Sequence, residues 1–155
     1  MARLSDLPEW ERPHHLDKIK TLPDYGPTPF APGPPLNQRR VAIVTTAGLH
    51  RRDDRAFEMG SADYRIIPGD TPAAELVMSH ISVNYDRSGF QEDINVVFPI
   101  DRLRELEAAG TIGSVSEFHY SFMGASQGHT LEGKARELAA LMKKDGVDAV
   151  LLTPV

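Results

Sequence analysis

Two runs of consecutive apolar residues stand out after residue 38. Residues 39–48 (RRVAIVTTAG) and 147–155 (VDAVLLTPV) are almost continuously apolar, which is typical of strands buried on both faces of a parallel sheet. Residues 99–110 and 129–146 instead place apolar side chains three or four positions apart, and a glycine ends each stretch. This spacing predicts two amphipathic helices, each closed by its glycine.

Weaker patterns fill the space between these elements. Residues 62–70, 74–83 and 114–122 predict short strands, whereas the polar stretch 84–95 has no clear period and predicts a loop. The second helix followed by the apolar run 147–155 is the second half of a β-α-β unit. We therefore expect an α/β fold, a Rossmann- or flavodoxin-like layered structure with a mostly parallel sheet that is incomplete at its C-terminus.

Prolines are concentrated at the start of the chain, where eight of the twelve precede residue 36. Each proline fixes its own φ and removes a backbone donor, so residues 25–36 are expected to be extended and polyproline-like. We divide the chain into a proline-rich N-terminal arm, residues 1–38, and an α/β domain, residues 39–155.

The charge and composition of the chain exclude several classes of partner and site. The net charge is −5, which argues against a nucleic-acid partner. No apolar run is long enough to cross a bilayer, and the charged, proline-broken N-terminus predicts a cytoplasmic protein without a membrane partner. The chain has no cysteine, which excludes disulfides, zinc–thiolate sites and a cysteine nucleophile within these residues.

The chain stops at Pro154-Val155, directly after the last predicted strand. Functional crevices of open α/β sheets lie at the carboxyl ends of the strands, so the chain stops where an active loop is expected. Pattern alone leaves two interpretations open. Either the protein is cut off at this point, or it is a small domain whose last strand ends the chain.

Several segments, in this order, carry a resemblance to a known family. The chain resembles the selenoprotein B family of glycine, sarcosine and betaine reductases, which includes the selenocysteine subunit of D-proline reductase. The segments are VAIVTTAGLH (41–50), YRIIPGD (64–70), SHISVNYD (79–86), QEDINVVFPIDRLRELEAAGTIG (91–113), HYSFMG (119–124) and DGVDAVLLTPV (145–155).

The resemblance implies an oxidoreductase that cleaves a carbon–nitrogen bond of a small amine or amino-acid substrate. It implies a selenocysteine or cysteine shortly after the last strand, in a U-x-x-C-like arrangement. Selenocysteine is encoded by UGA, which is easily misread as a stop codon. We therefore expect this chain to be an N-terminal fragment of a longer selenoprotein. We expect the fragment to be inactive alone, to lack its own cofactor and to self-associate. The implied partners are a subunit with a pyruvoyl group and a selenoprotein A-like carrier.

Candidate site residues lie near the ends of predicted strands and in the loops that follow them. His80, Asp86 and His119 are the candidates for supporting catalytic roles, orienting substrate or moving a proton. The alternatives are that His80 bonds the neighbouring backbone, Asp86 caps a turn and His119 lies in the core. Two histidines and a carboxylate could also hold a metal, but their spacing is not diagnostic, and no metal is predicted.

A second set of residues is predicted to bind the substrate. Thr46 and Gly48 belong to the TTAG segment, whose backbone amides are suited to an anion. Asp93, Asn95 and Ser121 lie in or beside loops that follow other predicted strands.

A different class of function also remains open, a non-catalytic α/β domain for small-molecule binding or assembly. The reading frame beyond Val155 distinguishes the reductase from the non-catalytic domain. An in-frame UGA followed by coding sequence with a nearby cysteine supports the enzyme, and an ordinary stop supports the binding domain.

Overall fold

The computed structural model describes residues 3–24, 26–27, 31–82 and 87–155. The chain divides into two compact units, residues 1–31 and 32–155. The first unit holds the 3₁₀-helix η1 (Leu4–Asp6) and the helix α1 (Arg12–Lys20), neither of which the sequence pattern predicted. Pro13 lies in the first turn of α1, where a helix tolerates proline. Residues 26–27 and 31–35 form no helix or strand, and the rest of the predicted extended segment up to Phe30 lies outside the described residues.

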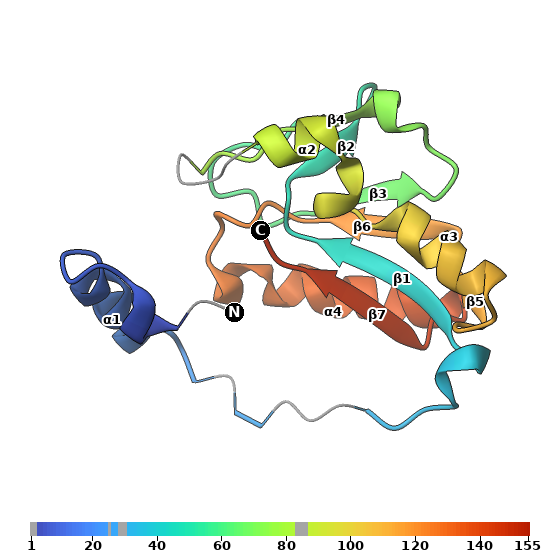
Figure 1. Cartoon of the computed structure of the whole chain (residues 1–155), viewed down its shortest axis with the longest axis horizontal. Coiled ribbons are helices and arrows are strands. Elements are labelled where there is room, and N and C mark those ends of the chain that lie inside the picture. Colours follow the sequence, from blue (N-terminus) through green and yellow to red (C-terminus); the bar gives the residue numbers. More distant parts are fainter. Residues whose placement is uncertain (1–2, 25, 28–30, 83–86) are drawn as a thin grey trace. The chain divides into compact units, whose positions relative to one another are not determined.

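The second unit is built around one mostly parallel sheet (Figure 1). Strand β1 lies at its centre, with β7 on one side and β5 and β6, end to end, on the other. Strand β3 pairs antiparallel with β6. A separate two-stranded antiparallel sheet joins β2 to β4. The strands are β1 (Arg40–Thr45), β2 (Leu49–Arg51), β3 (Arg65–Pro68), β4 (Leu76–Met78), β5 (Ser114–Val115), β6 (Phe118–Ser121) and β7 (Ala149–Thr153).

Helices lie on both faces of the sheet, as expected for a layered α/β fold (Figure 1). Helix α3 (Ile100–Ala108) buries Ile100 and Leu103 against the face of β1 that carries Val41 and Ile43. Helix α4 (Gly128–Lys144) buries Leu138 against Tyr120 and Phe122. The shorter helices are η2 (Leu36–Gln38), η3 (Ala73–Glu75), α2 (Ser88–Glu92) and η4 (Ile94–Val96).

The structure confirms the α/β fold, the two long helices and the parallel pairing of the two apolar runs. It corrects three details. The predicted loop 84–95 contains α2 and most of η4. The predicted strand 74–83 is reduced to β4, because residues 73–75 form a 3₁₀ turn. The apolar spacing in 129–146 predicts that Ala135 is buried together with Leu131, Leu138 and Met142, but Ala135 is exposed and Leu141 packs against the core instead.

The side chain of His119 takes the place of a strand neighbour of β1 in the gap between β5 and β6. On the side away from β7, strand β1 pairs with β5 at Val41 and with β6 at Val44, so between these positions it has no neighbouring strand on that side. His119 fills this place, because its Nδ1 accepts a hydrogen bond of 3.0 Å from the N–H of Ile43. The imidazole is fully buried and stands edge-on to the ring of Phe98.

Candidate functional site

Strands β1, β6 and β7 run parallel, so their carboxyl ends at Thr45, Ser121 and Thr153 meet at one edge of the sheet. Functional crevices of α/β sheets lie at this edge. We call it the carboxyl edge, made of residues 45–48, 121–124 and 153–155, with His80 beside it.

A pair of hydrogen bonds ties the end of the chain to the loop after β1. The hydroxyl of Thr46 accepts from the N–H of Val155 at 2.8 Å and donates to the carbonyl of Val155 at 3.3 Å. The N–H of Thr46 also donates to the carbonyl of Thr153. The hydroxyl of Thr45 donates to the Thr153 carbonyl as well, and the side chain of Thr46 is the one that holds Val155.

Gly124 closes this arrangement from the β6 side. Its N–H donates to the carbonyl of Thr46, and a Cβ at this position would lie 2.6 Å from the carbonyl oxygen of Val155. Such a distance is far inside van der Waals contact, so only glycine allows the three segments to approach this closely.

The structure brings His80 to the same edge. The amide of Gly48 donates to the carbonyl of Phe122, and the carbonyl of Gly48 accepts from Ser79. Gly48 has φ +65°, and a Cβ there would lie 3.0 Å from the backbone nitrogen of His80. Two of the predicted residues, Gly48 and His80, are thus in direct contact.

The environment of His80 favours the neutral imidazole. Burial, reinforced by the positive charge of Arg87, lowers the pKa of His80 below its ordinary value. Its Nδ1 accepts from the N–H of Ser82 at 3.2 Å, which places the ring proton on Nε2. Neutral His80 is therefore suited to donating a hydrogen bond, more than to acting as a strong proton donor.

The TTAG loop does not present the amides that an anion would need. The N–H groups of Thr46, Ala47 and Gly48 donate to the Thr153 carbonyl, the Thr45 hydroxyl and the Phe122 carbonyl. Ser121 is similarly occupied, since its buried hydroxyl accepts from the N–H of Leu49 at 2.8 Å. In this structure these loop amides and the Ser121 hydroxyl make the hydrogen bonds that hold the carboxyl edge together.

The other predicted residues lie elsewhere. His119 is inside the sheet, as described above. Asp93 caps η4 by accepting from the N–H of Asn95, and the Asn95 side chain bridges Asp93 to Asp101 at the start of α3. Asp93 and Asn95 line a cavity of about 460 Å³ to which residues 45–48 do not contribute. Asp86 lies outside the described residues.

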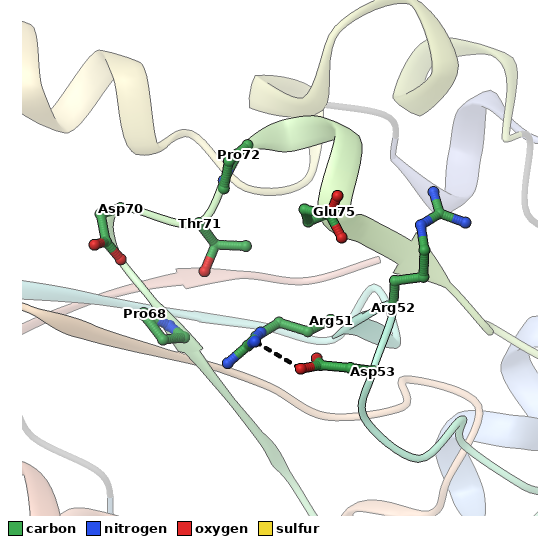
Figure 2. Close-up of a pocket in the computed structure, with 8 residues that line it drawn as sticks. All are labelled: Arg51, Arg52, Asp53, Pro68, Asp70, Thr71, Pro72 and Glu75. Carbon is green, nitrogen blue, oxygen red and sulfur yellow. Dashed lines mark hydrogen bonds and ion pairs between the residues drawn. The ribbon is translucent and has the colours of Figure 1, made fainter.

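A second cavity, of about 430 Å³, has walls of both charges (Figure 2). Figure 2 shows the Arg51 guanidinium paired with Asp53, across the cavity from Thr71 and Asp70. This ion pair measures 2.7 Å. Pro68, another wall residue, pairs with Phe118 at the start of β6, the opposite end of that strand from Ser121. This cavity is therefore separate from the carboxyl edge.

Sequence reasoning missed two residues of the edge. One is Gly124, whose position after a predicted strand was the only signal. The other is Thr153, whose buried Oγ1 has no hydrogen-bond partner among the described residues. In the described ranges no three His, Asp or Glu side chains are grouped as metal ligands, and no helix there has the length and apolar character to span a bilayer.

The layered sheet makes this chain an α/β protein. Its candidate site is the carboxyl edge, where the parallel strands end. The family model for glycine/sarcosine/betaine reductase selenoprotein B matches residues 27–155, and the chain belongs to this family. The resemblance read from the sequence is thereby confirmed. No solved structure gives a significant match.

Named relatives are components of reductase complexes. The chain is 39% identical over 121 residues to the D-proline reductase subunit gamma of Acetoanaerobium sticklandii, covering 76% of this chain and 49% of the relative. It is 39% identical over 123 residues to the glycine reductase complex component B subunit gamma of Carboxydothermus hydrogenoformans, covering 76% and 28%. It is 30% identical over 128 residues to the betaine reductase complex component B subunit beta of Peptoclostridium acidaminophilum, covering 79% and 29%. The chain thus spans half or less of the length of these relatives.

Proposed function

We propose that this chain is part of a selenoprotein B-like reductase and that its carboxyl edge positions a selenol or thiol nucleophile supplied by polypeptide following Val155. The observation that carries the proposal is the paired hydrogen bond between the Thr46 hydroxyl and the Val155 backbone. It directs any following residue to the edge that holds Gly48 and His80. Family membership and the greater length of the relatives support the same assignment.

The proposed reaction is reductive cleavage of a carbon–nitrogen bond in a small amine or amino acid. A selenol ionises at lower pH than a thiol, so the nucleophile attacks as the anion. It bonds to the carbon that carries nitrogen, the carbon–nitrogen bond breaks with its electron pair on nitrogen, and nitrogen takes a proton. A thiolate then attacks the selenium or sulfur of the adduct, the bond from that atom to carbon breaks, and carbon keeps the electron pair and takes a proton. A second thiol reduces the mixed bond that results, so that a disulfide forms and the nucleophile is regenerated. A pyruvoyl-containing subunit and a selenoprotein A-like carrier are the partners in this proposal, and the cytoplasm is its location.

In this proposal His80 is a positioning residue. Its Nε2–H hydrogen bond orients the nucleophile or the substrate, and its neutral form is maintained by burial and by Arg87. Asp86 follows in the same segment, and its role as a partner of His80 stays a prediction.

Thr46 gives the direct test. In the full reading frame that contains this chain, Thr46→Val keeps the shape of the side chain but removes both hydrogen bonds to Val155, so turnover should fall at least about tenfold, the loss of one well-aligned contact of about 1.4 kcal/mol. Thr46→Ser keeps the hydroxyl and should remain near wild type. The 155-residue chain, which has no cysteine, is the inactive control. Equal turnover of the valine and serine variants would remove the Thr46 contact from the function.

His80→Ala in the same full-length protein should lower turnover by about two to three powers of ten, the range for removing one preorganised hydrogen-bond donor. Wild-type turnover should be flat around neutral pH and decline on the acid side, below the lowered pKa of His80, because the imidazolium loses the Nδ1 contact with Ser82. The matched control is His14→Ala, at an exposed histidine of the first unit. Undiminished turnover of His80→Ala, with a native circular dichroism spectrum, would remove His80 from the site.

A further inference from the structure

A buried arginine that the proposed reaction does not use lies next to the carboxyl edge. Arg65 begins β3 and pairs with Ser121, the last residue of β6. Its side chain is only 6% exposed. Its guanidinium donates to three backbone carbonyls, those of Arg55 at 2.8 Å, Tyr64 at 3.0 Å and Ala56 at 3.2 Å.

The carbonyls, more than a countercharge, compensate the burial of this guanidinium. A buried charge is destabilising unless its donors are satisfied. The carboxylate that pairs with Arg65, that of Asp63, lies 3.8 Å from Nη1 and is itself 43% exposed. Arg55 and Ala56 belong to the loop between β2 and β3, residues 52–64. In the same loop the ring of Phe57 lies under the guanidinium, 4.4 Å from centroid to Cζ. Arg65 therefore holds residues 55–57 in place.

Side chains, and not a backbone ladder, fix this part of the loop. Among the described residues, no hydrogen bond joins the backbone of residues 55–57 to another backbone group. Two of their carbonyls bind Arg65, and the N–H of Phe57 donates to the hydroxyl of Ser79 at 2.9 Å. Ser79 is thus the point where the loop meets the segment that carries His80.

Ser79 also joins this segment to the loop after β1. Its N–H donates to the carbonyl of Gly48 at 3.0 Å, and its hydroxyl donates to the same carbonyl at 3.4 Å. His80 follows directly, with its backbone nitrogen packed against Gly48. The backbone that carries the imidazole is therefore held from two sides, by Gly48 and by the loop that Arg65 fixes.

We propose that Arg65 and Ser79 are positioning residues that hold the imidazole of His80 at the carboxyl edge. Arg65 fixes residues 55–57, the N–H of Phe57 fixes the Ser79 hydroxyl, and Ser79 fixes the backbone of His80. All of these contacts lie between residues 48 and 80, well inside the described part of the chain. The consequence for turnover rests on the proposed function, whereas the effect on His80 itself does not.

The imidazole of His80 reports its own position. In NMR spectra of the 155-residue chain, its Cε1–H resonance is assigned with His80→Ala. Ser79→Ala removes the acceptor of the Phe57 N–H, so this resonance should shift. It should also titrate closer to the ordinary pKa of 6.5, because burial is the larger cause of its lowered value. Arg65→Lys should act in the same direction, since one ammonium group cannot replace a guanidinium that spans three carbonyls.

Ser116→Ala is the matched control. Ser116 is 3% exposed, and its hydroxyl likewise accepts one backbone N–H, that of Phe118 at 3.3 Å, at the opposite end of β6 from the carboxyl edge. Its removal should destabilise the chain to urea about as much as Ser79→Ala, but it should leave the His80 resonance and titration unchanged. Destabilisation alone is therefore distinguished from a displaced imidazole.

Turnover of the full-length protein tests the consequence for the reaction. Ser79→Ala should lower turnover about fivefold, the effect of one hydrogen bond, and should lower it no further in a His80→Ala background, because Ser79 acts through His80. Full turnover of His80→Ala would remove His80 from the proposed function and leave the NMR result to decide the positioning. Ser79→Ala and Arg65→Lys proteins with an unchanged His80 resonance and titration would overturn the proposal, as would a further fall in the double variant.

Discussion

Replacing His119 by alanine is expected to lower the free energy of unfolding by about 3 kcal/mol, the sum of an unsatisfied buried donor and a partly filled cavity. The imidazole is completely buried, and its Nδ1 is the acceptor for the N–H of Ile43 at the break between β5 and β6. Without it, that N–H has no partner in the sheet, and the ring of Phe98 loses its neighbour. Urea unfolding of the 155-residue chain measures the loss.

Asparagine at position 119 separates the two contributions. Its side-chain oxygen can occupy the place of Nδ1, so His119→Asn should recover about 1–2 kcal/mol of the loss by restoring the acceptor. Equal destabilisation by alanine and asparagine would show that the hydrogen bond contributes little and that packing alone makes the difference.

The same histidine should make stability depend on pH. Burial, with a smaller contribution from Arg104, lowers the pKa of His119 from 6.5 to about 4. The unfolded chain therefore takes up this proton first as the pH falls. Its stabilising contribution is complete above pH 6.5 and is lost progressively toward pH 4, by about 1.4 kcal/mol per pH unit. His119→Asn should flatten this part of the profile, leaving the contribution of His80, whose pKa is also lowered.

The fold was predictable where the apolar pattern is regular. The run 39–48 became the central strand β1, and the spacing in 99–110 and 129–146 became α3 and α4. Prediction failed where tertiary contacts override local pattern. Residues 84–95 are polar and aperiodic, yet Asp93 caps η4 and Asn95 joins it to α3, so short helices form there.

The site was predictable only in part, for a related reason. Strand ends can be read from sequence, and that rule located Thr46, Gly48 and His80. The structure places Gly48 against the backbone of His80 and Thr46 against Val155. The sequence rule cannot show which polar groups are already used in hydrogen bonds that hold the fold together. The amides of the TTAG loop, the hydroxyl of Ser121 and the imidazole of His119 all look available in sequence, but each is used by backbone hydrogen bonds between distant segments.

Gly124 lies where three segments of the carboxyl edge pack against one another. It is the point where the loops after β1 and β6 and the end of β7 are closest. Its φ is not in the left-handed region, so a larger residue is excluded by space alone and not by backbone strain. That distinction makes its substitution a clean test of the packing between these three segments.

Gly124→Ala is expected to destabilise the chain by about 2–3 kcal/mol, the range for overpacking a tight contact. The new methyl would lie 2.6 Å from the Val155 carbonyl oxygen and 2.9 Å from that of Thr46, so one of the two segments must move. Amide exchange of Thr46 and Val155 should accelerate, because their hydrogen bonds join the displaced segments. Gly133→Ala is the matched control: a Cβ there meets nothing within 4 Å, and within α4 it should stabilise the chain by about 0.5–1 kcal/mol. A Gly124→Ala protein as stable as the wild type, with unchanged exchange at Val155, would mean that the end of β7 is not held against this loop in solution.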